Sequence, residues 1–223
     1  MHVLRKNSSL SANNPANNLH TALKKAFIII LLILIADQAV KLWIKTNMFL
    51  GESISVFGNW FFIHFTENEG MAFGMQLGGE WGKLILSLFR IAAVIAITYW
   101  LYRLTRKPVK TGLVVCVALI LAGATGNIID SAFYGLIFND STFSQVATMF
   151  PEGGGYASFL HGKVVDMFYF PILSGTYPGW IPGVGGEDFI FFRPVFNIAD
   201  ASITTGVLTL VVFQKKFFAK PGE

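Results

Sequence analysis

Two aspartates at the borders of apolar segments are the residues of this chain best suited to chemistry. Asp166 lies in the segment VVDMF and Asp200 in the segment FNIAD. A carboxylate is costly to place at a membrane boundary, so two of them indicate chemistry rather than packing. When two carboxylates share a site, one stays protonated while the other draws a proton from water. The water then attacks a carbonyl group that the protonated partner polarises.

Further polar residues occur in pairs, three or four positions apart, within apolar segments. The pairs are Asp37 with Lys41, Asn127 with Asp130, and Asn197 with Asp200. This spacing puts both members of a pair on one face of a helix. We expect all three pairs near the outer ends of their helices, with Asn68 on the same side. The polar residues should therefore converge at one level.

Several of these residues also have a structural explanation. Asp37 and Lys41 can form an ion pair that neutralises itself and anchors a helix at the membrane boundary. Asn127 can hydrogen-bond a neighbouring helix, and Asp130 can be a solvated residue where a helix emerges. For Asp166 and Asp200, catalysis is the favoured explanation.

The composition identifies the elements that must position these groups. The chain has 223 residues, of which 53% are hydrophobic and 13% charged, with a mean hydropathy of +0.57. These values are typical of an integral membrane protein. Four segments are long and apolar enough to span a bilayer: 26–44, 84–102, 111–138 and 196–213. The sequence predicts an all-α membrane bundle of four transmembrane helices with a small periplasmic β-hairpin or sheet and a long periplasmic loop.

The charges predict the orientation of the bundle. Eleven of the seventeen basic residues lie in three clusters, before the first span, between the second and third, and after the fourth. Twelve of the thirteen acidic residues lie in or beside the two other loops. The basic side should therefore face the cytoplasm, with both termini inside. The net charge of +4 reflects this topology and gives no indication of a nucleic-acid partner.

The predicted domain organisation is simple. Residues 1–22 are rich in Ser and Asn and should form a flexible cytoplasmic tail; 23–216 form the membrane domain, and 217–223 a second cytoplasmic tail. The first outer loop, about 45–83, contains two β-rich runs around Gly58-Asn59, which predicts a hairpin. The second, about 139–195, is rich in Gly and Pro, which argues against regular strands there.

Other chemistries lack their motifs. The chain contains no Gly-x-Ser-x-Gly, His-Glu-x-x-His or Gly-x-x-x-x-Gly-Lys sequence, and a single cysteine offers no metal cluster. We expect no metal and no cofactor. A transporter or channel component, or a scaffold without enzymatic activity, remains an alternative, because intramembrane Asp and Asn can also bind protons or cations.

Five motifs in order resemble those of lipoprotein signal peptidase, also called signal peptidase II. They are DQAVK at 37–41, NEGMAFG at 68–74, GNIID at 126–130, VVD at 164–166 and FNIAD at 196–200. The resemblance covers about residues 26–213. It implies an aspartic endopeptidase of the bacterial inner membrane that removes the signal peptide from diacylglyceryl-modified prolipoproteins, on the amino side of the lipidated cysteine.

The resemblance also implies roles for individual residues. Asp166 and Asp200 are the catalytic dyad, near the periplasmic face. Substrate binding and support fall to the residues Asn68, Gly70, Asn127, Asp130, Asn197, Asp37 and Lys41. The implied partners are lipidated prolipoproteins and membrane lipid, and cyclic peptide inhibitors such as globomycin should bind the dyad.

Two departures from the family pattern concern the outer side. Ser131 stands where the family has Arg after the Gly-Asn-x-x-Asp motif, so a cation has to come from elsewhere or be absent; Arg193 is one candidate. The intervals between Asp130, Asp166 and Asp200 are also longer than in the family, which enlarges the second outer loop.

Overall fold

Three long apolar helices form the body of the protein. The computed structural model describes residues 15–69, 79–106, 109–191 and 194–219. Its long helices are α1 (Pro15–Asn47), α2 (Gly79–Thr105) and α3 (Thr111–Ile129). Within the described residues, three segments are long and apolar enough to cross a membrane: Thr21–Asn47, Trp81–Thr105 and Thr111–Ile137. They contain the first three predicted spans apart from the last residue of the third, Phe138.

α1 begins earlier than expected. The segment 1–22, which the composition predicts to be a flexible tail, is helical from Pro15 onward. Proline suits the first turn of a helix, where its missing N–H group is not needed. The alanines and leucines that follow favour continuation of the helix into the apolar span.

The fourth apolar helix, α5 (Ile198–Val212), has 15 residues and is followed by the short α6 (Gln214–Phe218). α5 is shorter than the three long spans, so a fourth crossing of the membrane stays a prediction. It packs tightly on α3, because a Cβ atom added at Gly123 would lie 2.2 Å from the carbonyl oxygen of Ala199. The Ser202 hydroxyl also donates to the Leu119 carbonyl at 2.9 Å.

A four-stranded antiparallel sheet joins the two outer loops. Its strand order is β1-β2-β3-β6, with bounds Ser53–Phe57, Phe61–Asn68, Val164–Tyr169 and Val195–Phe196. The predicted first-loop hairpin is thus present as β1 and β2. In the register of β2 and β3, Thr66 pairs with Asp166 and Asn68 pairs with Val164. This pairing brings two of the predicted site motifs together.

The expectation that the second outer loop lacks regular strands is wrong, whereas the small sheet expected beside the helices is present. This loop supplies β3 and β6 and a separate hairpin of β4 (Leu173–Thr176) and β5 (Asp188–Phe191). The β-branched and aromatic run that forms β3 finds its partner in the first loop. A strand's tertiary partner thus outweighs the Gly and Pro content of the loop around it.

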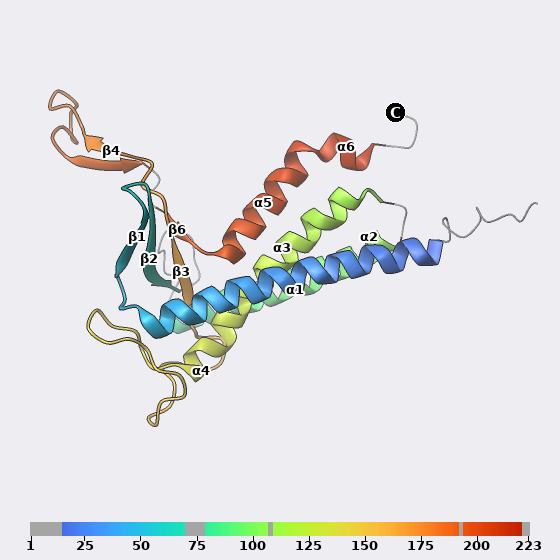
Figure 1. Ribbon diagram of the computed structural model, residues 1–223, viewed down its shortest axis with the longest axis horizontal. Helices are drawn as coiled ribbons and strands as arrows, with labels where there is room; N and C mark the ends of the chain where they lie inside the picture. Colours follow the sequence, from blue (N-terminus) through green and yellow to red (C-terminus); the bar gives the residue numbers. More distant parts are fainter. Residues whose placement is uncertain (1–14, 70–78, 107–108, 192–193, 220–223) are drawn as a thin grey trace, which may run out of the picture.

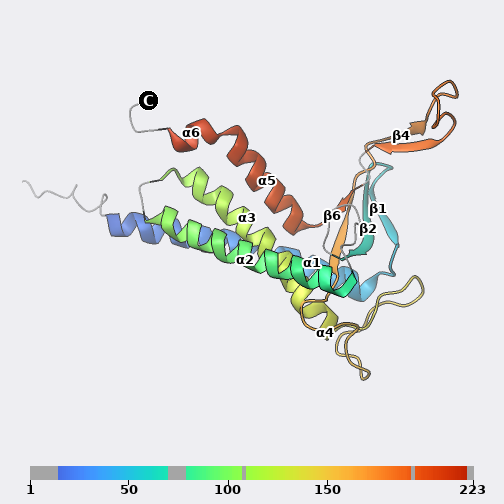
Figure 2. The same ribbon diagram turned by 180° about the vertical axis from the view of Figure 1, so that it is seen from behind.

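The sheet and the helix ends that bear basic residues lie at opposite ends of the molecule. In Figures 1 and 2, α1, α2 and α3 run side by side, the sheet crosses one end of them, and the β4–β5 hairpin projects beyond it. The start of α1 and α6 lie at the other end. Large apolar side chains such as Phe27, Leu32 and Phe89 are exposed on the helices, as lipid-facing residues are.

Candidate active site

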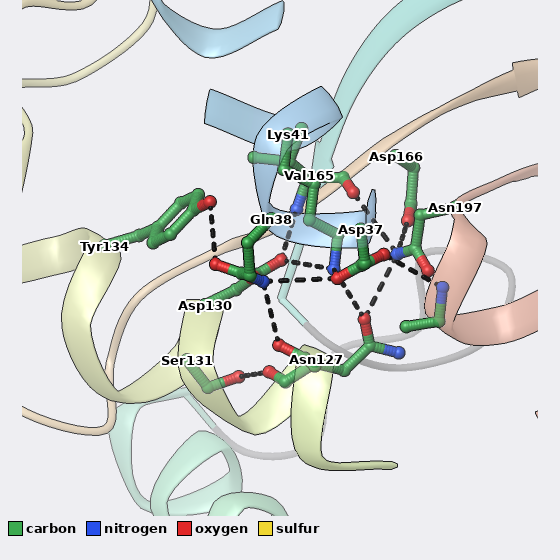
Figure 3. Close-up of polar contacts among 12 residues, drawn as sticks. Asp37, Gln38, Lys41, Asn127, Asp130, Ser131, Tyr134, Val165, Asp166 and Asn197 are labelled. Carbon is green, nitrogen blue, oxygen red and sulfur yellow. Dashed lines mark hydrogen bonds and ion pairs between the residues drawn. The ribbon is translucent and has the colours of Figure 1, made fainter. Parts of the chain in front are cut away.

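Asp166 lies on β3, an inner strand of the sheet, and its side chain points toward Asn197 at the start of α5 (Figure 3). Its side chain is buried, with 3% of the residue exposed. The Asn197 amide donates to one carboxylate oxygen at 2.7 Å, and the Asn68 amide donates to the other. Asn68 is the last residue of β2, so strand pairing sets this second contact.

Asp200 is fixed by the way α5 begins. Asn197 is the N-cap of the helix, and its side-chain oxygen accepts from the Asp200 backbone N–H at 2.8 Å. Asp200 in turn accepts from the Asn197 backbone N–H at 3.4 Å, which completes a capping box. The Asn127 amide donates to the other Asp200 oxygen at 2.7 Å. The FNIAD motif therefore starts a helix and holds the carboxylate of its third helical residue.

Two asparagines connect the two aspartates. Asn197 donates to Asp166, and Asn127 donates to Asp200. The same Asn197 amide group also donates to the Asn127 side-chain oxygen at 3.1 Å. The two carboxylates are thus held by one network of amides, although they come from a strand and a helix far apart in sequence.

Lys41 lies fully buried beside this network. Its ammonium group is 2.9 Å from Asp37, 2.8 Å from Asp130 and 3.0 Å from the Asn127 oxygen. The ion pair expected between Asp37 and Lys41 is present, and it extends to a second carboxylate on α3. Lys41 therefore neutralises carboxylates that support the site and orients one of the bridging asparagines.

Asp37 and Asp130 hold the backbone next to each member of the aspartate pair. Asp37 accepts from the Ala199 backbone N–H at 2.9 Å, one residue before Asp200. Asp130 accepts from the Val165 backbone N–H at 3.2 Å, one residue before Asp166. Both carboxylates are thus supporting groups that fix the start of α5 and the strand β3.

The end of α3 is a π-helical turn, Asp130–Tyr134, followed by α4 (Gly135–Ile137). Such turns are frequent at functional sites. Here the turn carries Asp130, which also accepts from Gln38 at 2.8 Å. Ser131, where the family pattern has Arg, is buried and donates to the Asn127 carbonyl at 3.1 Å. Its hydroxyl satisfies the helix backbone and supplies no charge.

The surroundings of Asp166 raise its pKa to about 8. Burial is the largest cause, followed by the nearby Asp200 carboxylate. Lys41 and the amides of Asn68 and Asn197 act in the opposite direction. Asp166 is therefore a neutral carboxylic acid at pH 7, and Asp200, which is partly exposed, lies beside it.

Six of the seven predicted support residues gather around the pair: Asn68, Asn127, Asp130, Asn197, Asp37 and Lys41. Gly70 and the candidate cation Arg193 lie outside the described residues. The structure settles positions only, so the catalytic role of the pair stays a prediction. One carboxylate of the pair can activate a water molecule while its protonated neighbour donates a hydrogen bond to a carbonyl oxygen.

Arg90 on α2 is a site residue that the sequence motifs miss. Its guanidinium group lies within electrostatic range of the carboxylates of Asp200, Asp130 and Asp166. It belongs to none of the five motifs. The signal that identifies it is a single basic residue within an otherwise uncharged span, 84–102.

Comparison with known proteins covers most of the described chain. A model of the signal peptidase (SPase) II family matches residues 29–216. A lipoprotein signal peptidase of Porphyromonas gingivalis is 53% identical over 185 residues, covering 82% of this chain and 80% of the relative. One of Amoebophilus asiaticus is 36% identical over 200 residues, covering 88% and 80%. A solved structure described as a bacterial membrane enzyme matches with a TM-score of 0.60 at 25% identity, covering 90% of this chain and 93% of that one.

Proposed function

Because the chain belongs to the signal peptidase II family of proteases, we propose that it is an aspartic endopeptidase. Its substrates are diacylglyceryl-modified prolipoproteins, and it cuts on the amino side of the lipidated cysteine. Membership of a peptidase family sets aside the transporter and scaffold alternatives. The relatives named as lipoprotein signal peptidases support the substrate class.

The observation that carries the aspartic mechanism is the shared amide network of Asp166 and Asp200. The Asn197 amide donates to Asp166 and the Asn127 amide donates to Asp200, and Asn197 also donates to the Asn127 side-chain oxygen. Two carboxylates held in this way from two different elements are pre-organised for one reaction, since their rotamers are fixed before substrate arrives.

The environments of the two aspartates assign their roles. Asp200, partly exposed, takes a proton from a water molecule, whose oxygen attacks the scissile carbonyl carbon. Asp166, neutral at pH 7 because its pKa is about 8, donates to the carbonyl oxygen as negative charge develops there. When the C–N bond breaks, the proton on Asp200 passes to the departing nitrogen, which leaves as the amine of the lipidated cysteine.

The location of the site suits a substrate that is anchored in lipid. Asp166 is on β3 and Asp200 is in the first turn of α5, and Figure 1 shows these two elements meeting where the sheet crosses the ends of the helices. The diacylglyceryl chains and the signal-peptide helix both remain in the bilayer, which brings the scissile amide to this level. We place the enzyme in the bacterial inner membrane as a four-span protein with α5 as the fourth span. Both termini are cytoplasmic, because Lys24, Arg106 and Lys216 lie at the far end from the sheet.

Cyclic peptides of the globomycin type should occupy the same site. Such a ligand presents backbone carbonyl groups to a neutral Asp166 and to the side-chain amides beside it. We expect globomycin to inhibit cleavage competitively with the lipidated substrate. Inhibition that does not weaken as substrate concentration rises would place the inhibitor elsewhere.

The test is cleavage of matched peptides by the purified protein in detergent. One peptide carries the diacylglyceryl group on cysteine and the other carries free cysteine. We expect cleavage of the lipidated peptide alone, with product masses that put the cut before the cysteine. Glu152→Gln is the control, because Glu152 is an exposed loop carboxylate. No cleavage by the wild type, or equal cleavage of both peptides, contradicts the proposal.

A further inference from the structure

The loop that follows α4 folds back along the helix it has just left. Figure 1 shows this loop at the end of the molecule that carries the sheet. The Tyr156 N–H donates to the Phe138 carbonyl at 2.9 Å. Further along the loop, the Gly162 N–H donates to the Ser131 carbonyl at 2.8 Å. The loop therefore advances as the helix residues that it contacts recede, and we call residues 150–162 the strap.

The strap lies beside a membrane span and not beyond it. Its first residue, Phe150, donates its N–H to the Ile137 carbonyl at 2.7 Å, and its last contact is with Ser131. Both of these helix residues belong to the apolar span Thr111–Ile137. Six residues of helix at about 1.5 Å each place the two contacts roughly 9 Å apart along the span. The strap thus accompanies the last turns of the span.

The backbone of the strap is matched to this position. Peptide groups at membrane depth need partners within the protein. The Ala157 N–H donates to the Gly135 carbonyl at 2.9 Å, next to the π-helical turn. The strap also approaches the helix backbone closely, because a Cβ atom added at Gly162 would lie 2.2 Å from the Asp130 carbonyl oxygen. These contacts fix the strap against the helix.

A second membrane span holds the strap from another side. The Ser87 hydroxyl on α2 donates to the Leu160 carbonyl at 3.0 Å. Ser87 lies inside the span Trp81–Thr105, and the Leu160 side chain is buried. The strap is therefore bonded to two helices within their apolar segments.

Aromatic side chains of the strap remain exposed at this level. Phe159 is 52% exposed, and its ring contacts that of Phe133 with the centroids 6.0 Å apart. Phe133 belongs to the α3 span and is itself 46% exposed. Phe150, at the level of Ile137, is 74% exposed, and Phe89, two residues beyond Ser87 on α2, is 70% exposed. The lipid-facing surface of the two spans thus continues onto the strap.

We propose that the strap is a lipid-contacting element of the second outer loop, with Phe150 and Phe159 in contact with the lipid of the outer leaflet. The occupant of this surface is lipid because the exposed rings are continuous with helix faces that already meet the bilayer. Aromatic side chains are favoured at the boundary between membrane and water. The exposed carboxylate of Glu152 stays on the aqueous side, at the tip of the strap.

The lipid contact has a consequence for the aspartate pair. The strap ends two residues before β3 (Val164–Tyr169), which carries Asp166. An element that is bonded to two spans and embedded in lipid holds the start of this strand at a fixed depth. The inference goes beyond the proposed function and does not rest on it, since it concerns where the loop lies and not what is cleaved.

The experiment measures the depth of nitroxide spin labels on the full chain in lipid nanodiscs. Labels are attached at Phe159→Cys and Phe150→Cys in a Cys116→Ser background, and collision rates with oxygen and with a water-soluble nickel chelate are compared. Phe89→Cys is the lipid-facing reference, and Glu152→Cys is the matched control within the strap. We expect the ratio of oxygen to nickel collisions at Phe159 to approach that at Phe89 and to exceed that at Glu152 several-fold. Phe150 should give an intermediate ratio.

Two results overturn the inference. Ratios at Phe159 and Phe150 equal to that at Glu152 would place the strap in water. Protection of both positions from oxygen and nickel alike would mean that protein, such as a second copy of the chain, covers them.

A second variant keeps the test decisive if Phe159→Cys does not fold. Phe159→Trp retains an aromatic ring and should add fluorescence that brominated lipids quench, whereas Glu152→Trp should add fluorescence that they leave unquenched. Equal quenching of the two added tryptophans would contradict the inference. Neither measurement uses cleavage, so a failure of the proposed function would leave both results unchanged.

Discussion

Two clusters of charge, each centred on a buried lysine of α1, lie one helical turn apart and differ in the ratio of cations to carboxylates. The dyad cluster has Lys41 at its centre and contains the carboxylates of Asp37, Asp130, Asp166 and Asp200. The latch cluster has Lys45 at its centre and contains Glu67, Ser141, Lys163 and Asp140. Lys41 and Lys45 are both 0% exposed.

The latch cluster pairs each ammonium group with a carboxylate. Lys45 bonds to Glu67 and to the Ser141 hydroxyl at 2.9 Å, and Lys163 bonds to Asp140 at 2.8 Å. The Tyr156 ring lies between the two lysines, 5.1 and 5.2 Å from their nitrogens. These contacts tie the outer end of α1 to β2 and to the loop before β3. A cluster of this kind holds the strands that carry Asn68 and Asp166.

The dyad cluster has more carboxylates than cations. Lys41 forms ion pairs with the two supporting aspartates, Asp37 and Asp130. Arg90 lies within electrostatic range of Asp166 and Asp200. A proton on Asp166 removes one of the two negative charges that remain. Charged side chains that are paired with each other join segments of the chain. A buried carboxylate that is kept neutral by a proton is instead available for chemistry.

The largest expected difference between the clusters is in activity. Asp166→Asn and Asp200→Asn should each lower kcat/KM by roughly 1,000-fold or more, because removal of one member of a catalytic unit disables the whole unit. Their thermal stability should not fall, since each substitution removes a carboxylate from a site with too many. The measurement is cleavage of the lipidated peptide alongside thermal unfolding in the same detergent. Cleavage by either folded variant at more than a tenth of the wild-type rate would remove that residue from the mechanism.

Lys41→Met should have the largest effect on stability. It leaves Asp37 and Asp130 buried without their ammonium partner, at a cost of about 3–5 kcal/mol in the free energy of unfolding. Denaturant unfolding in detergent measures this cost. Adding Asp37→Asn and Asp130→Asn to Lys41→Met should recover part of it. A stable Lys41→Met protein would show that these carboxylates are already protonated.

Glu67→Gln tests the latch cluster. It should lower the free energy of unfolding by about 2 kcal/mol, because the charged bond between Glu67 and Lys45 is lost while Ser141 still accepts from the lysine. The folded protein should cleave within a few-fold of wild type, since Glu67 does not contact the aspartate pair. Glu152→Gln, at an exposed loop position, is the matched control. A 100-fold loss of kcat with unchanged stability would make Glu67 part of the reacting site.

The smallest effect concerns the alkaline limb of the pH profile. Asp166 must be protonated to donate, and its pKa is raised to about 8, so kcat/KM should be half-maximal near pH 8 and fall at higher pH. The Asn68 amide donates to this carboxylate and favours its charged form. Asn68→Ala should therefore move the limb to higher pH by a fraction of a unit. A limb that moves to lower pH would mean that Asn68 stabilises the neutral acid.

Much of the site follows from local sequence. The spacing of Asp37 and Lys41 and of Asn197 and Asp200 is fixed by helix geometry, so both pairs appear as predicted. The long spans follow from hydropathy because a membrane protein satisfies its backbone within helices.

What the sequence misses depends on partners far away in the chain. Arg90 has no motif, and only packing on α3 shows which groups it faces. β3 requires β2 as its partner, and the latch cluster joins α1, β2 and the enlarged loop. Contacts between segments that are distant in the chain produce no periodic sequence pattern within either segment.

The most direct test of the account is an infrared titration of the purified protein in detergent. We expect a protonated carboxylic acid band at pH 7 that disappears as pH rises through about 8. This band should be absent in Asp166→Asn and present in Glu152→Gln. A wild-type spectrum without the band at pH 7, or a band that persists in Asp166→Asn, would contradict the claim that Asp166 of the dyad cluster carries a proton.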